Sequence, residues 1–211
     1  RADLWVYDAE NPGAGLSGNP ISILSLCTDT PRSLAVSADR KTVYAAGFLS
    51  GNQTTAIDEA NVNNTQAAPN TDINGELAPR SGLIVKYKDG KWLDGSARDW
   101  SQNVKLSLPD KDVFAINADA NIPTLKKEYA HVGTVLFNMA VNPLTGSIYV
   151  TNTDANNSVR FEGPGTHATS VRGNTMLNRI TVIKGNAVVP IHLNNHVDFT
   201  LPIGQAIPAS E

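Results

Sequence analysis

The chain has 211 residues, of which 41% are hydrophobic and 18% charged, a composition that supports a globular fold with a sizeable core. Its formal net charge of -3 and its scattered basic residues exclude the basic stripe that nucleic-acid binding requires. No apolar run approaches the roughly 18 residues that a membrane-spanning helix needs.

The first residue is Arg1 rather than methionine, which predicts a processed mature form or an excised piece and argues for export. Cys27 is the single cysteine, so the sequence contains no internal disulfide and no CxxCH haem-attachment motif. Cysteine avoidance fits a reducing cytosol as well as a bacterial export route. We expect a periplasmic or extracellular protein, at a bacterial cell surface.

The N-terminal part predicts strands joined by turns. Residues 4–8 (LWVYD) form a first short strand pattern. Residues 33–46 (SLAVSADRKTVYAA) then predict a strand, a polar turn that contains Asp39, and a second strand that contains Tyr44. We expect an antiparallel hairpin there.

A long polar insertion follows over residues 50–81, rich in Asn, Thr and Pro. Loops of this length in a compact domain are usually functional or mobile. Residues 82–90 alternate between apolar and polar side chains and predict a third strand, with an edge strand at residues 92–93. Together with the hairpin, these segments predict a four-stranded antiparallel unit.

The same succession recurs in the second half of the chain. Residues 113–117 correspond to residues 4–8, and residues 138–151 (NMAVNPLTGSIYVT) align with residues 33–46 without a gap. Tyr149 falls where the first copy has its tyrosine. The chain therefore contains an internal repeat that is longer than one hairpin.

The second copy also has an insertion, over residues 153–178. Residues 179–185 predict its third strand and residues 187–193 its edge strand. The repeats make residues 1–211 a single segment of one architecture.

Residues 149–152 spell YVTN, and their flank, residues 137–146 (FNMAVNPLTG), resembles the AVSPDG turn of the bacterial YVTN-repeat β-propeller family, as residues 35–39 (AVSAD) do more weakly. The first copy departs from the pattern, with YAAG at residues 44–47 and Arg40 where a turn glycine is usual. The resemblance implies an all-β fold: a partial β-propeller of about three to four four-stranded antiparallel blades with long loop insertions. The alternative is an open, sandwich-like stack of sheets.

His192 and His196 form an H-x3-H pair with Asp198 nearby. On a helical turn or in a tight loop, such a set could bind zinc or copper. In an extended strand the two imidazoles would lie roughly 13 Å apart, too far for one metal ion. The alternative is a pair of hydrogen-bonded surface or inter-blade histidines.

Two oxygen-rich segments are candidate calcium sites. Asn70, Asp72 and Asn74 precede a glycine at the sixth position of a calcium-loop pattern, although the twelfth position is Ser81 rather than a glutamate. The alternative is an Asx-turn loop without metal.

The second such segment is Asn152, Asp154 and Asn156, at the end of the YVTN strand, where a hydrogen-bonded bend is the alternative. Calcium or a transition metal is therefore the candidate cofactor.

Arg160, Glu162 and Arg172 lie in the second insertion. The arginines could recognise a carboxylate, and solvated ion pairs are the alternative. We therefore expect no more than a binding role for these charged residues.

These observations favour a binding or scaffold module whose loops present a recognition surface to a protein, a polysaccharide or a flanking domain, with oligomerisation as a further option. The resemblance also implies a second hypothesis, the propeller portion of a larger cytochrome c or peroxidase-like redox protein, with haem only in a flanking domain. A third is a lactonase-like or metal-assisted propeller hydrolase, in which His131, His192 and His196 would have to converge. No catalytic set can be defined from spacing, so we expect no catalysis within these residues.

Overall fold

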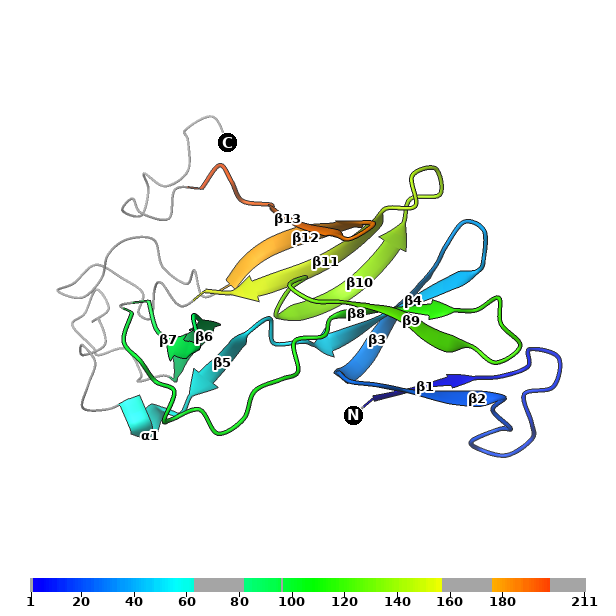
Figure 1. Ribbon diagram of the computed structural model, residues 1–211, viewed down its shortest axis with the longest axis horizontal. Coiled ribbons are helices and arrows are strands. Elements are labelled where there is room, and N and C mark those ends of the chain that lie inside the picture. The colour runs from blue at the N-terminus through cyan, green and yellow to red at the C-terminus, as the bar shows by residue number, and fades with distance from the viewer. Residues whose placement is uncertain (1, 63–81, 96, 157–175, 198–211) are drawn as a thin grey trace, which may run out of the picture. The chain divides into compact units, whose positions relative to one another are not determined.

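A computed structural model describes residues 2–62, 82–95, 97–156 and 176–197 (Figure 1). These residues form thirteen β-strands and one short helix, which confirms the predicted all-β class. No helix among them has the length and apolarity needed to cross a membrane. The described residues fall into two compact units, the first within Arg1–Asn52, Leu108–Thr153 and Arg179–Ile191 and the second within Gln53–Ser107, Asp154–Asn178 and His192–Glu211.

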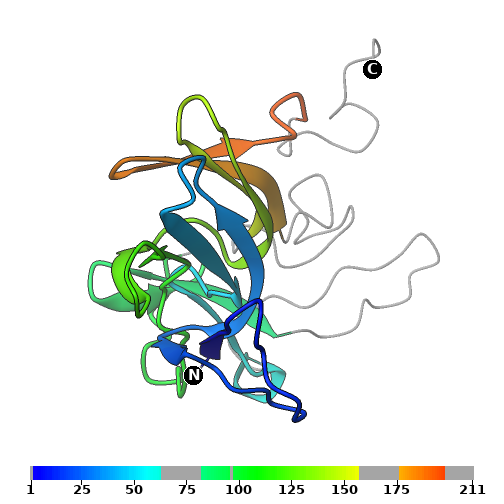
Figure 2. The same cartoon turned by 90° about the vertical axis from the view of Figure 1, so that its right-hand side faces the viewer.

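The largest sheet is antiparallel and contains β3 (Asp29–Val36), β4 (Thr42–Leu49), β8 (Val113–Asn117), β9 (Thr124–Tyr129), β10 (Val135–Val141), β11 (Ile148–Ala155), β12 (Met176–Lys184) and β13 (Ala187–His192). Its strand order is β13-β12-β11-β10-β4-β8-β9, with β3 also paired to β4, and Figure 2 shows that it is curled. The strands β10 and β4 join through the pair of Val135 with Leu49. We call β3-β4-β8-β9 the first half-sheet and β10-β11-β12-β13 the second half-sheet.

The gapless repeat gives each half-sheet two corresponding faces, because side chains alternate along a strand. The A face carries Ala35, Tyr44 and Ala46 in the first half-sheet and the aligned Ala140, Tyr149 and Thr151 in the second. The B face carries Leu34, Val43 and Ala45 in the first half-sheet and the aligned Met139, Ile148 and Val150 in the second.

One hydrophobic cluster joins the A face of the first half-sheet to the B face of the second. Ala46 and Val113 come from the first half-sheet, and the second contributes Leu136, Met139, Ile148, Val150 and Ile183. A separate hairpin, β1 (Ala2–Val6) with β2 (Ser22–Leu26), packs Leu4, Leu24 and Leu26 against Ala45, Phe114 and Ile116 on the B face of the first half-sheet. The strands β4 and β8 are therefore buried on both sides.

The second unit contains β5 (Thr54–Ile57), α1 (Glu59–Val62), β6 (Leu83–Lys88) and β7 (Lys91–Leu93), with the strands in one antiparallel sheet. Its core cluster consists of Ile57, Val62, Leu83, Val85 and Trp100. The buried carboxylate of Asp94 accepts hydrogen bonds from Arg98 Nε (2.7 Å) and Trp100 Nε1 (2.9 Å). These bonds satisfy a charge that burial would otherwise disfavour.

The predicted strands of the second copy lie as expected, since residues 179–185 and 187–193 fall on β12 and β13 beside the β10-β11 hairpin. The first copy differs, because β6 does not continue the β3-β4 hairpin and β8 pairs with β4 instead. The reason lies in side-chain pattern: four successive residues of β8 are apolar and buried, as a central strand requires, whereas β6 carries exposed or half-exposed lysines. The first insertion thus extends past residue 81 and holds a small sheet.

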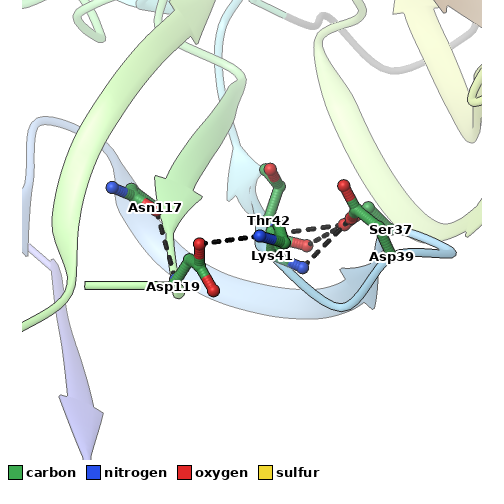
Figure 3. A network of polar contacts seen from close by, with 6 residues as sticks. All are labelled: Ser37, Asp39, Lys41, Thr42, Asn117 and Asp119. Atoms are coloured by element: carbon green, nitrogen blue, oxygen red, sulfur yellow. Dashed lines mark hydrogen bonds and ion pairs between the residues drawn. The ribbon is translucent and has the colours of Figure 1, made fainter. Parts of the chain in front are cut away.

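The turn between β3 and β4 is fixed by short polar contacts (Figure 3). Arg40 has a φ of 60°, the left-handed conformation that a turn glycine adopts at no cost. Asp39 stabilises this turn, because its Oδ1 accepts hydrogen bonds from the Ser37 hydroxyl (2.6 Å) and the Lys41 backbone N–H (3.0 Å). The same two bonds lower the pKa of the Asp39 carboxyl. Lys41 Nζ lies 3.0 Å from Asp119, which links this turn to the β8-β9 turn.

Candidate functional site

The A face is covered by the shared cluster in the first half-sheet, where Ala35 and Tyr44 are half-buried, and is exposed at the aligned positions of the second. Tyr44 packs against the shared cluster, and burial raises the pKa of its hydroxyl. Tyr149 occupies the aligned position and is 41% exposed. Ala46 is buried in the cluster, whereas the aligned Thr151 is exposed. The same strand positions therefore have different surroundings in the two copies.

The A face continues across β12, where Ile180 and Val182 are half-buried, and across β13, where Val189 and Ile191 are exposed. Thr181 lies on the B side, where its hydroxyl meets Asn152, and Val188 packs against the shared cluster. Because side chains alternate along a strand, the neighbours of these two residues lie on the A side, and Val189 there is 52% exposed. We call this surface the outer face; its members are Ala140, Tyr149, Thr151, Ile180, Val182, Val189 and Ile191.

At the other end of the repeat, the B face of the first half-sheet is only partly covered. The β1-β2 hairpin places Leu4 and Leu24 against the cluster that contains Phe114. On β3, however, Leu34 is 57% exposed, whereas the aligned Met139 is 8% exposed. Within the described residues, β3 lacks the cover that the same positions of β10 receive.

The asparagine of the YVTN segment, Asn152, is buried in a polar network. Its Nδ2 donates hydrogen bonds to the carbonyl of Val150 (2.9 Å) and the hydroxyl of Thr181 (2.8 Å), and its Oδ1 accepts one from Arg179 Nε (3.2 Å). Arg179 Nη2 and the Thr181 hydroxyl both donate to the carbonyl of Val132. A guanidinium beside Oδ1 opposes a cation at that oxygen, so Asn152 joins β11 to β12 as a structural residue.

The neighbouring candidate calcium ligands are placed differently. Asp154 Oδ2 lies 2.9 Å from Lys86 Nζ, and its side chain is largely buried. Asn156 is half-buried at the end of the described part of this strand region. A lysine beside Asp154 supplies the positive charge that a calcium ion would bring.

Sequence analysis did not single out Asp112, a fully buried carboxylate near this network. Its Oδ2 accepts hydrogen bonds from the backbone N–H of Val132 (2.5 Å) and Gly133 (3.3 Å), and its Oδ1 accepts one from the Ser50 hydroxyl. Burial raises the pKa of this carboxyl to about 7, and the negative charge of Asp110 adds to the effect. The one signal in the sequence was its position directly before four consecutive apolar residues, 113–116.

His131 and Asp110 form a surface contact next to this carboxylate. His131 Nδ1 lies 3.8 Å from Asp110 Oδ2, and the imidazole is exposed. Both residues have positive φ, 63° and 55°, in the left-handed region that is unusual for residues other than glycine. The contact therefore joins two positions at which the backbone is strained.

The H-x3-H pair lies at the end of β13. His192 Nδ1 is 3.2 Å from Asn195 Oδ1, and the residues that follow His192 form a turn that includes His196. Among residues 2–62, 82–95, 97–156 and 176–197, no group of three or more His, Cys, Asp or Glu side chains could hold a metal ion. The other predicted site residues lie outside the described ones: Asp198, Asn70, Asp72, Asn74, Arg160, Glu162 and Arg172.

The outer face is thus the best-defined candidate site. It is a largely aliphatic surface on four paired strands, with Lys184 at the end of β12 on the same side. On the opposite side, the bond between Asn152 and Thr181 joins β11 to β12. Comparisons of the chain with protein-family models, with curated proteins and with solved structures find no match.

Proposed function

We propose that the chain is a binding or scaffold module of β-propeller type, with YVTN-like blades, that acts in the periplasm or outside the cell. Its outer face would pack against a β-sheet of a protein partner. The observation that supports this proposal is the contrast between Tyr149, which is 41% exposed, and the aligned Tyr44, which packs into the shared cluster.

The packing inside the chain provides the precedent for such a partner. Met139 and Val150 of the second half-sheet cover the A face of the first half-sheet around Tyr44. Sheets that pack face to face lie about 10 Å apart and interdigitate their side chains. A partner sheet with aliphatic residues like these would cover Tyr149 and Val189 in the same way.

Binding through the outer face requires the burial of several apolar side chains at once, because one alone does not offset the free-energy cost of association. Full burial of one large apolar side chain contributes about 1.5 to 3 kcal/mol. Association costs about 4 to 15 kcal/mol in lost translational and rotational freedom, so one exposed tyrosine is not enough. Val189 and Ile191 extend the surface beyond Tyr149. Apart from the hydroxyl groups of Tyr149 and Thr151, the outer face is mostly aliphatic and offers few hydrogen bonds to sugar hydroxyls, which favours a protein over a polysaccharide.

The test is hydroxyl-radical footprinting of the purified chain, alone and mixed with a cell-envelope extract of the producing cells. In the isolated chain at low concentration, Tyr149 should be oxidised readily and Tyr44 slowly, as their exposures require. The extract should protect Tyr149 and leave the low reactivity of Tyr44 unchanged. Equal oxidation of Tyr149 with and without extract would refute the proposal.

A matched pair of variants locates the contact. Ile191→Lys places a charge on the outer face and should abolish the protection of Tyr149. Leu144→Lys places the same charge on a side chain that is 94% exposed in the turn between β10 and β11, away from this face, and should leave the protection intact. If both variants behave alike, the protection does not arise from the outer face.

A further inference from the structure

We propose that a pocket beside the turn between β2 and β3 binds a small molecule with an apolar body and one amine group. The pocket has a volume of about 500 Å³ and belongs wholly to the first unit. Its lining residues come from the end of β2, the turn, the start of β3 and the segment before β8: Ser25, Leu26, Cys27, Thr28, Asp29, Leu108 and Pro109. The site shares no residue with the outer face and does not depend on it.

The volume of the pocket indicates the size of the ligand. Pockets for small molecules measure about 300 to 1,000 Å³ and are lined mainly by apolar side chains, with a few polar groups that fix the orientation of the ligand. A protein interface usually takes about 20 to 30 residues from each side, many more than line this pocket. A hollow bounded by two short segments of the chain therefore fits a small molecule better than a protein.

Three close contacts hold the walls of the pocket in place. Leu26 is buried in the core cluster that the β1-β2 hairpin shares with β4 and β8. Thr28 is buried and lies directly against Gly47, where an added Cβ would overlap the Thr28 hydroxyl oxygen. Leu108 lies against Gly51, where an added Cβ would be 2.9 Å from the Leu108 Cβ. The pocket is therefore pre-formed, and a ligand does not have to order its walls.

The charge of the pocket indicates the polar group of the ligand. Among the described residues that line the pocket, only Asp29 has a charged side chain, and it is half-buried. Its Oδ1 accepts a hydrogen bond from the Thr30 hydroxyl (3.0 Å), and a carboxylate can accept several such bonds. Lys111 lies near Cys27, but its Nζ is 2.6 Å from Glu128 Oε2, so Glu128 already compensates this positive charge. A carboxylate beside an apolar pocket favours a ligand that brings an ammonium group.

The thiol of Cys27 is a built-in reporter for this pocket, because it is exposed, lines the pocket and belongs to the single cysteine of the sequence. The probes are phenylbutylamine and its uncharged analogue phenylbutanol, and the rate at which the full chain reacts with neutral N-ethylmaleimide is measured with and without each probe. The amine should slow the reaction saturably, with half-protection at about 1 mM or below. The alcohol should require about tenfold higher concentrations, because it lacks the charge. Glutathione in the same solutions controls for direct effects of the probes on the reagent.

Three variants locate the binding of the probes. Asp29→Asn removes only the charge, so it should weaken protection by the amine about tenfold and leave protection by the alcohol unchanged. Leu108→Ala removes part of the apolar wall and should weaken protection by both probes about fivefold. Leu144→Ala, at a side chain that is 94% exposed and does not line the pocket, is the matched control and should change neither. Absence of saturable protection by the amine, equal protection by the two probes, or indifference of the amine to Asp29→Asn would each overturn the proposal.

Discussion

Replacing Asp112 with asparagine should remove a large part of the pH dependence of stability. The pKa of the buried carboxyl is about 7, against an ordinary value of 3.8, so its ionised form is disfavoured by about 4 kcal/mol in the fold relative to the unfolded chain. Between these two values the folded protein holds a proton that the unfolded chain has lost. The free energy of unfolding therefore falls as pH rises, by about 3 kcal/mol from pH 5 to pH 8.

Urea denaturation at pH 5, 6, 7 and 8 measures this effect. Asp112→Asn keeps an oxygen to accept from the Val132 N–H and gains an amide that can donate to Ser50, so the variant should be at least as stable as the parent at pH 8 and should lack the decline. Asp119→Asn removes a carboxylate from the surface beside Lys41 and serves as the control for charge. A parallel decline in the parent and in Asp112→Asn would refute the assignment to this buried carboxyl.

Three further substitutions test the packing described above. Phe114→Ala empties a fully buried site in β8 and should lower the free energy of unfolding by about 3 to 5 kcal/mol in urea titrations. Gly133→Ala would place its Cβ 2.5 Å from Asn152 Oδ1 and 2.8 Å from Asn152 Cβ, and calorimetry should show a loss of about 1 to 3 kcal/mol, whereas Gly15→Ala, with nothing within 4 Å, should be neutral. Asn152→Ala removes partners from buried groups and should cost about 1 to 3 kcal/mol by the same calorimetry; an unchanged melting temperature would contradict its structural role.

The second half-sheet could be predicted from the sequence because its strands are consecutive in the chain. Residues 138–151 carry an alternating pattern on either side of a turn that contains Pro143 and Gly146, and residues 179–185 continue the alternation after the insertion. Local pattern and turn chemistry are enough when neighbours in sequence are also neighbours in the sheet.

The first half-sheet could not be predicted in the same way, because β4 pairs with β8 and not with β6, which comes between them in the sequence. Alternation in residues 82–90 correctly indicated a strand but carried no information about its partner. The wholly apolar run in residues 113–116 was the better evidence for a central position, since such a strand must be covered on both faces. Pairing between distant segments depends on burial of the complete sheet, which periodicity alone does not describe.

The candidate sites show a related limit. Asn152 and Asp154 were selected because oxygen ligands recur at alternate positions, yet the structure places Arg179 and Lys86 beside them. A sequence pattern identifies donors and acceptors but does not say which of them face each other. Asp112 shows the reverse case: nothing in the sequence marks it as a site, and its burial, with the charge of Asp110, raises the pKa of its carboxyl to about 7.

A comparison of aligned residues in the two described copies supports a functional reason for the exposed apolar residues of the outer face. In stacked repeat proteins the terminal units usually carry a polar outer surface, because they have no neighbour to cover them. In the two described copies, some exposed positions carry residues of the kind that is covered in the other copy: Tyr149 repeats Tyr44, and Leu34 stands where the second copy has the buried Met139. The exposed Thr151, by contrast, replaces the buried Ala46. Apolar side chains that stay in solvent contribute nothing to the core and favour aggregation. The aromatic residue that Tyr149 shares with Tyr44 is therefore consistent with the proposed cover of the outer face by another sheet.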